Sequence, residues 1–445
     1  MPDWEAPGWS QRQVAGMANP RPQNDSAPDL RIVEIDVLRG IALIGIFWIN
    51  VVIFGLPHGA YSLPVLLGDA VDLNIGLWAF SEVFVEGAMR GLFSLLFGAS
   101  TLIFLNEAKL ESKDGIRVVD RYYRRCLTLL AFGLVHAFIL LGQWDLLYAY
   151  GLLGMFLFPV RNFKASTLIA IAMVLFVISD FNTFTENYEA LLGNDEQRQL
   201  SLDPGSDYRD EVRATTVDEF QSDLTTYRSG YLDIFLAQIP VIVEQQSSKM
   251  YTDHFYDVGG MMLIGMALFK LGILTGQRSL QFYLVLAAVG YLAGGMLHGV
   301  ECYELWRVDF NAEARDPFLM MPYNIGRLMM TLGHIGTFGA LIHFGVIKRL
   351  APYLAPVGRM ALTNYIGQTV LSVLFFYGCG LGYFGYLERY ELTWVFLAVI
   401  GIEIVSSIVW LKYYRFGPLE WLWRSITYGS FQKMSRTHGT SPART

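Results

Sequence analysis

Two residues in the N-terminal half of the chain could act together as a general base. His136 lies late in one apolar segment, and Asp145 opens the next. A carboxylate that orients an imidazole is a common arrangement for proton removal. We therefore predict that His136 and Asp145 are catalytic. The alternative is a buried histidine bonded to a carbonyl.

A second polar pair opens the first apolar segment. Asp36 and Arg39 are three positions apart, so a helix would place them on one face. Asn50 would lie on the same side, about 20 Å further along the axis. In the functional interpretation Arg39 binds an anionic group, such as the phosphates of an acyl-CoA, and Asp36 orients it. The alternative is an interfacial anchor.

Further ionisable residues fall inside apolar segments, where they are energetically costly and normally face protein or water. Glu82, Glu86 and Arg90 occur at four-residue steps, which predicts a helical ion pair between Glu86 and Arg90. A structural ion pair and a substrate-binding or proton-relay role both fit this spacing.

Two C-terminal segments carry polar stripes that fit either ligand contacts or interhelical hydrogen bonds. Arg327 and His334 lie on one, and Asn364 and Gln368 on the other. We find no nucleophile elbow, zinc-protease motif or phosphate-binding loop. The three cysteines have no metal-binding spacing, and we predict no metal site. A disulfide between Cys302 and Cys379 is left open.

The composition decides the class of protein that must position these residues. Of 445 residues, 53% are hydrophobic and only 16% are charged, and soluble proteins are usually nearer a quarter charged. Repeated apolar runs are long enough to cross a bilayer as helices. We predict an all-α polytopic transmembrane helix bundle with about ten spans, near residues 38–56, 76–107, 122–141, 145–160, 165–183, 255–275, 279–298, 323–345, 357–376 and 392–411.

Lysine and arginine residues set the expected orientation. The 108–125 and 270–278 connections are basic, whereas 57–75 and 142–144 contain no basic residue. Basic loops stay in the cytoplasm, so both termini should be cytoplasmic, with His136 and Asp145 near the outer face. The net charge of −7 argues against nucleic-acid binding.

The same patterns divide the chain into five parts. The fifth and sixth spans are joined by a long acidic connection, whose apolar stretch 230–243 contains Pro240 and predicts a surface helix or a lid. The predicted parts are a mobile cytoplasmic tail (1–30), an N-terminal transmembrane half (31–183), an acidic external loop (184–254), a C-terminal transmembrane half (255–430) and a cytoplasmic tail (431–445).

Several stretches resemble the DUF418 (YeiB-like) membrane proteins. They include "RIVEIDVLRGIALIGIFWIN" (31–50), "FSLLFGAS" (93–100), "GQWDLLYAYGLLG" (142–154), "GRMALTNYIGQT" (358–369) and "RFGPLEWLWRSITYG" (415–429). The last of these is the most specific. The resemblance covers nearly the whole chain, but the family is largely uncharacterised.

The opening Asp-x-x-Arg-Gly is also similar to that of two membrane acyltransferase groups, the acyltransferase-3 and heparan-α-glucosaminide N-acetyltransferase types. Acyltransferase-3 proteins have a histidine where this chain has Asn50. The heparan-type enzymes have an asparagine there and a histidine shortly after, which implies His58 as a catalytic base.

These features lead to three hypotheses. The first is an acyltransferase that moves an acyl group from a cytoplasmic acyl-CoA donor, with no covalently bound cofactor, to an envelope or small-molecule acceptor. The second is a transporter of a small organic solute, and the third is a membrane sensor or scaffold. In each, we expect a multi-pass protein of the bacterial inner membrane. Its partners would be the lipid bilayer and a small-molecule, lipid or sugar ligand, with a homo-oligomer left open.

Overall fold

The computed structural model describes residues 32–62, 64, 71–111, 114–192, 207–308, 310 and 322–436. The predicted 1–30 tail lies outside these ranges. The described part is helical and contains no β-strand, only one isolated bridge between Tyr414 and Ser435.

The first half of the chain contributes α2 to α8 and the segment after it contributes α10 and α11. Their bounds are α2 Val33–Gly55, α3 Gly59–Ser62, α4 Val71–Phe84, α5 Ala88–Glu111, α6 Gly115–Leu134, the π-helix η1 Val135–Ile139, α7 Leu147–Val160, α8 Ala165–Leu192, α10 Asp207–Tyr227 and α11 Tyr231–Gln246.

The second half begins with another π-helix and ends with a short amphipathic helix. The bounds are η2 Met250–His254, α12 Phe255–Lys270, α13 Leu280–Arg307, α15 Tyr323–His343, α16 Val346–Arg359, α17 Ala361–Phe376, α18 Arg389–Tyr413 and α19 Pro418–Tyr428.

Among the residues that the structure describes, six stretches are long and apolar enough to cross a membrane, which confirms an all-α membrane protein. They are Val33–Gly55, Asp72–Ala108, Ala165–Thr185, Leu280–Arg307, Tyr323–His343 and Arg389–Tyr413. The helices α7 and α17 are apolar but shorter. The count of ten spans and the cytoplasmic placement of both termini stay predictions.

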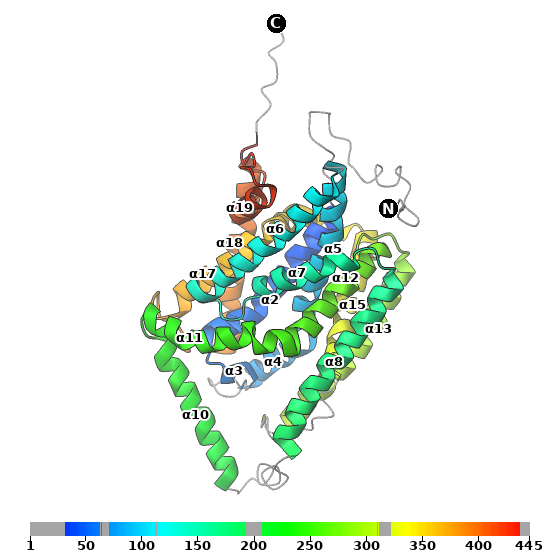
Figure 1. Cartoon of the computed structure of the whole chain (residues 1–445). Helices are drawn as coiled ribbons and strands as arrows, with labels where there is room; N and C mark the ends of the chain where they lie inside the picture. Colours follow the sequence, from blue (N-terminus) through cyan, green and yellow to red (C-terminus); the bar gives the residue numbers. More distant parts are fainter. Residues whose placement is uncertain are drawn as a thin grey trace.

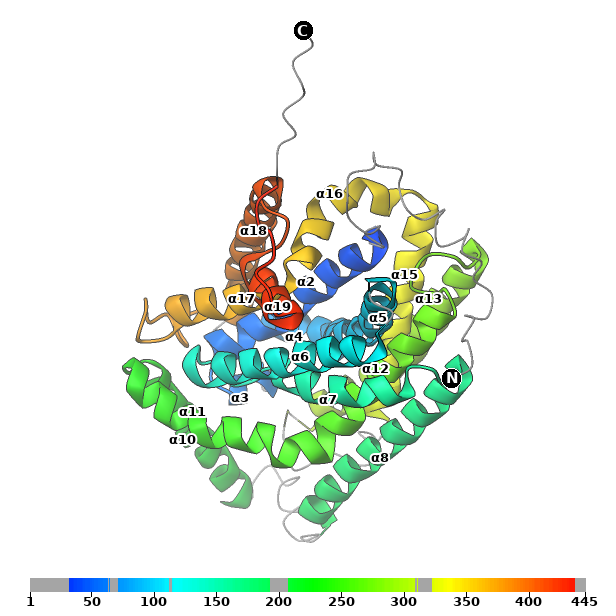
Figure 2. The ribbon, with the colours of Figure 1, turned by 45° about the horizontal axis from the view of Figure 1, so that its top comes forward.

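The apolar helices divide into central and peripheral ones. In α2, 56% of the apolar window is buried, against 17% in α13. Apolar side chains of α13 such as Leu292 and Met296 are exposed, as expected for a face that contacts lipid. Figure 2 shows α2 and α5 near the middle of the bundle, with α8, α13 and α18 toward its edge.

Close helix contacts in the centre depend on glycine. A Cβ atom at Gly98 of α5 or at Gly265 of α12 would collide with the backbone of the other helix. Gly40 of α2 and Gly358 of α16 form a similar contact. Small residues of this kind let membrane helices approach closely, which fixes the positions of α2, α5, α12 and α16.

The second predicted span is interrupted. The chain leaves helical geometry between α4 and α5, where Gly87 has a φ of 63°. Only glycine adopts that conformation readily. Helix α5 therefore starts at Ala88, and residues on the two sides of the break do not follow helical spacing.

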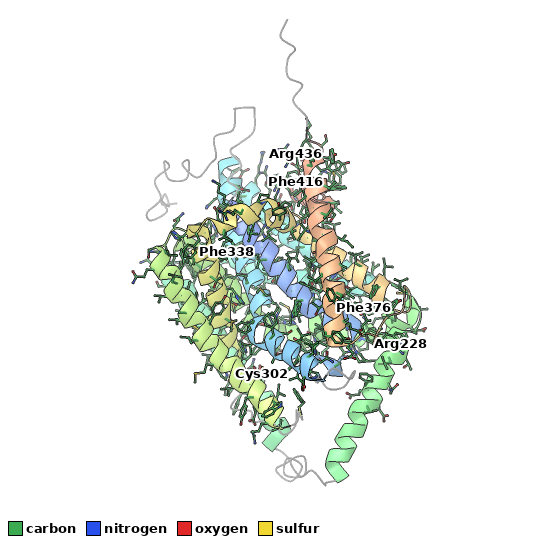
Figure 3. All side chains as sticks on the ribbon, turned by 180° about the vertical axis from the view of Figure 1, so that it is seen from behind. Arg228, Cys302, Phe338, Phe376, Phe416 and Arg436 are labelled. Carbon is green, nitrogen blue, oxygen red and sulfur yellow. The ribbon has the colours of Figure 1, made fainter. Side chains whose placement is uncertain are left out.

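The helix α2 sets the long axis of the bundle. It runs from the end where α19 lies toward α3 and α10 (Figure 1). Figure 3 shows Phe376, at the end of α17, on the same side as Arg228, whereas Phe416 and Arg436 lie at the opposite end. Asp36 lies in the first turn of α2, and Asn50 lies near its other end.

Candidate active site

His136 and Asp145 form a buried pair. Nδ1 of His136 lies 2.7 Å from Oδ1 of Asp145, and both side chains are almost fully buried. The backbone N–H of Tyr148 donates to the other carboxylate oxygen at 2.7 Å. Asp145 thus accepts a hydrogen bond from the first turn of α7. Its other oxygen orients the imidazole of His136, and this is the contact that the sequence predicts.

The second imidazole nitrogen faces a residue from a distant helix. Nε2 of His136 lies 2.7 Å from Oγ1 of Thr369 on α17. One turn earlier, Tyr365 packs its ring against the imidazole at a centroid distance of 5.0 Å. The Tyr365 hydroxyl accepts the N–H of Leu146 at 3.1 Å, so α17 closes the site from its far side.

The backbone around His136 is irregular in two ways. His136 lies in the π-helix η1, and Leu141 has a φ of 60°. A Cβ atom at Gly142 would lie 2.5 Å from Cε1 of His136, so the loop is folded tightly against the ring. π-helical turns and left-handed non-glycine residues are frequent at functional sites.

His58 lies at the rim of this site and has its own carboxylate. Its Nδ1 is 3.0 Å from Oδ2 of Asp223, which also accepts the backbone N–H of His58 at 2.9 Å. Its Nε2 is 2.8 Å from Nε2 of Gln143. Burial raises the pKa of Tyr227 to about 12, so its phenol stays protonated and donates to Oε1 of Gln143 at 3.2 Å.

A small pocket lies beside His136, and Gln143, which contacts His58, is one of its lining residues. The space inside it is about 10 Å³, which is room for about one water molecule. Trp144 is partly exposed at its edge. The pocket is lined by Asn50, Ile53, Phe54, His136, Gly142, Gln143, Trp144, Tyr365 and Thr369. Asn50, which was predicted to bind the substrate, thus lies in the same pocket as the predicted catalytic residue His136.

Asp36 and Arg39 lie at the other end of α2. Nη1 of Arg39 is 3.2 Å from Oδ1 of Asp36, and Nη2 donates to Oγ of Ser100 at 2.8 Å. A longer bond of 3.4 Å reaches the carbonyl of Gly358. In this conformation the pair ties α2 to α5 and α16.

The predicted ion pair between Glu86 and Arg90 is replaced by other contacts. Arg90 pairs with Asp257 of α12 at 3.2 Å, and Asp257 also pairs with Arg327. Glu86 accepts the hydroxyl proton of Tyr323 at 2.6 Å. The break at Gly87 explains the error, because four-residue spacing brings side chains together only on a continuous helix.

The remaining predicted ligand-binding residues lie outside the pocket. His334 is held between Tyr291 and the carbonyl of Phe84. Asn364 bonds to Ser407, and Gln368 donates to Glu403 at 3.1 Å, both on α18. Glu82 lies on α4.

Cys302 and Cys379 are free thiols, so the disulfide left open by the sequence is not present.

Four residues of the site were not predicted. Gln143 lies within the quoted stretch "GQWDLLYAYGLLG", two positions before Asp145, and could have been inferred from proximity. Asp223, Tyr365 and Thr369 are distant in sequence from the residues they contact. Tyr365 and Thr369 fall in the "GRMALTNYIGQT" stretch, so of the four residues only Asp223 lies outside the stretches that carry the family resemblance.

Comparison with known proteins supports the family. The chain is 29% identical over 415 residues to the uncharacterized protein YeiB of Escherichia coli (strain K12), covering 89% of this chain and 96% of the relative. It is 28% identical over 423 residues to the uncharacterized protein YxaH of Bacillus subtilis (strain 168), covering 91% and 96%. Residues 268–430 match the family described as "Protein of unknown function (DUF418)".

The C-terminal part of the chain therefore carries a DUF418 segment, and nearly the whole chain is similar to YeiB and YxaH. The matched DUF418 segment contains Tyr365 and Thr369, whereas His136 and Asp145 precede it. The site is therefore assembled from the matched segment and from the N-terminal half.

The helix α17 that carries Thr369 is capped by the specific C-terminal motif. Oε1 of Glu420 accepts the N–H groups of Leu362 and Thr363 at 2.8 and 2.9 Å. Oε2 accepts the hydroxyl of Thr363. These are N–H groups of the first turn of α17, which have no partner within their own helix.

We expect Glu420→Ala to lower the free energy of unfolding by about 1 kcal/mol, the usual effect of losing a helix N-cap. The midpoint of thermal unfolding in detergent measures it. Glu244→Ala, at an exposed position of α11, is the control and should change stability by less than about 0.5 kcal/mol. Equal midpoints for the two variants would contradict the capping role.

Proposed function

We propose that this protein is a membrane-embedded acyltransferase of the bacterial inner membrane. It would move an acyl group from an acyl-CoA-like thioester to a hydroxyl or amine of an envelope or small-molecule acceptor. The observation that carries the proposal is His136, held between Asp145 and Thr369 at a pocket.

His136 has the contacts that a general base needs. Asp145 holds Nδ1, which leaves Nε2 directed at a hydroxyl inside the pocket. When Nε2 takes a proton, the carboxylate at 2.7 Å stabilises the imidazolium. An acceptor hydroxyl in this position would lose its proton as it attacks the acyl carbonyl.

Two polar groups of the pocket can stabilise the oxyanion that forms during acyl transfer. The carboxamide of Asn50 has no hydrogen-bond partner within the described residues. The Tyr365 hydroxyl accepts from Leu146, and its own proton has no acceptor in the same part of the chain. Hydrogen-bond donors that are already fixed in place lower the barrier of such reactions most effectively.

The donor has to reach this pocket. In the proposal Arg39 holds the phosphates of acyl-CoA at the cytoplasmic end, about 16 Å from Asn50 along α2. Leu43 and Phe47 of α2 are fully buried between these positions. Entry of acyl-CoA therefore requires side chains along α2 to move. A small ester does not need the site for the CoA phosphates, so it serves as a second acyl donor in the test.

The test uses the full-length protein in lipid nanodiscs. It is given radiolabelled acetyl-CoA or p-nitrophenyl acetate with envelope sugars, lipids and amines as acceptors. Labelled acyl product from either donor supports the proposal. If neither donor transfers its acyl group, and a labelled organic solute instead crosses proteoliposomes chemically unchanged, the protein is a transporter.

We expect His58→Ala to reduce kcat/KM by about tenfold, less than the loss expected of a general base, which is about a hundredfold or more. His58 contacts the pocket through Gln143, so its removal would loosen that side chain without removing the base. Steady-state kinetics measure the effect. A loss as large as that of His136→Ala would identify His58 as the base.

A further inference from the structure

We propose that Thr369 is the nucleophile of this protein and carries the acyl group as a covalent ester between donor and acceptor. The inference rests on the proposed acyltransferase function and adds to it a two-step reaction through a named residue. The evidence comes from the hydrogen bond, the proton and the surroundings of the Thr369 hydroxyl.

The Thr369 hydroxyl differs from several other buried or half-buried hydroxyls on the helices of this bundle. A serine or threonine within a helix commonly donates to the carbonyl four residues earlier. Six side chains here do so at 2.7–2.8 Å: Ser81, Ser94, Ser100, Thr128, Thr331 and Thr427. Within the described residues, Thr369 makes no such bond, and its one partner is Nε2 of His136.

The hydrogen-bond network assigns the direction of that bond. A carboxylate only accepts hydrogen bonds, so Asp145 requires a proton on Nδ1 of His136. In neutral imidazole the other nitrogen then has a free lone pair. Nε2 is therefore the acceptor and the Thr369 hydroxyl is the donor. This is the arrangement in which a histidine activates a hydroxyl nucleophile.

Thr369 is buried but borders the pocket. Asn50 and Tyr365 border the same space, so an acyl carbonyl bound there would meet both the hydroxyl and the two donors. A nucleophile, a base, an orienting carboxylate and candidate oxyanion donors are the groups that acyl transfer uses, and here they lie in or beside one pocket.

In the first step Oγ1 of Thr369 attacks the thioester carbonyl and its proton passes to Nε2 of His136. The C–S bond then breaks, the thiolate takes the proton from His136, and CoA leaves as a thiol. In the second step the acceptor hydroxyl attacks the Thr369 ester and gives its proton to His136. The C–Oγ1 bond breaks, and the proton returns to Oγ1.

Acylation requires only the donor, so the test does not depend on knowing the acceptor. The full-length protein in nanodiscs is incubated with radiolabelled acetyl-CoA or p-nitrophenyl acetate and then quenched. Intact mass and peptide sequencing locate the label. With p-nitrophenyl acetate we expect a burst of about one nitrophenol per protein, which is the kinetic sign of a covalent intermediate.

The test variants and their control lie on the same helix, α17. Thr369→Ser keeps a hydroxyl and should retain acylation within about tenfold, whereas Thr369→Val keeps the shape and should lose at least about a hundredfold. Ser372→Ala is the control, because Ser372 is equally buried on α17 and does not line the pocket, and its hydroxyl has no hydrogen-bond partner within the described residues. It should acylate like the wild type. Thermal midpoints show that each variant is folded.

Label on Thr369 in the wild type and Ser372→Ala, and its absence in Thr369→Val, supports the inference. Acyl transfer that continues unchanged in Thr369→Val overturns it and leaves the acyltransferase proposal intact, with direct transfer between donor and acceptor. A wild-type protein that neither transfers nor retains an acyl group contradicts both.

Discussion

Replacing His136 by alanine should lower acyl transfer by about a hundredfold to ten-thousandfold, the usual contribution of a general base. The imidazole connects Asp145 to Thr369, and removing it leaves the pocket without another base in direct contact with Thr369. The measurement is transfer of labelled acetyl under single-turnover conditions, which separates chemistry from product release.

Asp145→Asn should cause a loss of similar order while the fold persists. An asparagine can offer its amide N–H to Nδ1, which would favour the tautomer with the proton on Nε2 and block removal of a proton from Thr369. His343→Ala is a matched control, because His343 contacts the carbonyl of Arg278 far from the pocket. Full activity in His136→Ala would refute the role of this site.

Replacing Asp257 by asparagine should lower the free energy of unfolding by about 3–5 kcal/mol, because it removes the shared partner of two arginines. Asp257 on α12 pairs with Arg90 on α5 and Arg327 on α15. Arg327 is 1% exposed. The midpoint of thermal unfolding in detergent measures the change.

A matched control lies one turn earlier in the chain. Asp253 pairs with Lys249 at 3.4 Å, and both side chains are about 30% exposed. Asp253→Asn should cost less than about 1 kcal/mol, as exposed ion pairs do. Adding Arg90→Gln to Asp257→Asn should recover part of the loss, because one uncompensated charge is removed. Equal midpoints for the two aspartate variants would contradict this role for Asp257.

The charge cluster and the pocket therefore have separate roles. Asp257, Arg90 and Arg327 join three helices, and Asn324 supports Arg327 with a bond of 3.0 Å. None of these residues lines the pocket. The Asp257 variant therefore tests stability, and the His136 variant tests acyl transfer. Each substitution should leave the property tested by the other largely unchanged.

Local patterns in the sequence were sufficient for the class of fold and for part of the site. The first predicted span, 38–56, corresponds to α2 at Val33–Gly55, because a long apolar run has few other ways to satisfy its backbone in a membrane. His136 and Asp145 were found because a short loop between two helices leaves their ends close together. The prediction of an ion pair between Glu86 and Arg90 was wrong, because nothing in the spacing reveals that the helix breaks at Gly87.

By itself, the sequence determined that this is an all-helical membrane protein that resembles the DUF418 proteins and has a histidine–aspartate pair between two neighbouring helices. Only the tertiary structure placed Thr369 against His136, Asp223 against His58, and Asp257 between Arg90 and Arg327. The physical reason is that apolar periodicity fixes which face of a helix is buried but not which helix covers it. That choice depends on close contacts such as those at Gly98 and Gly265, which arise only when distant segments pack together.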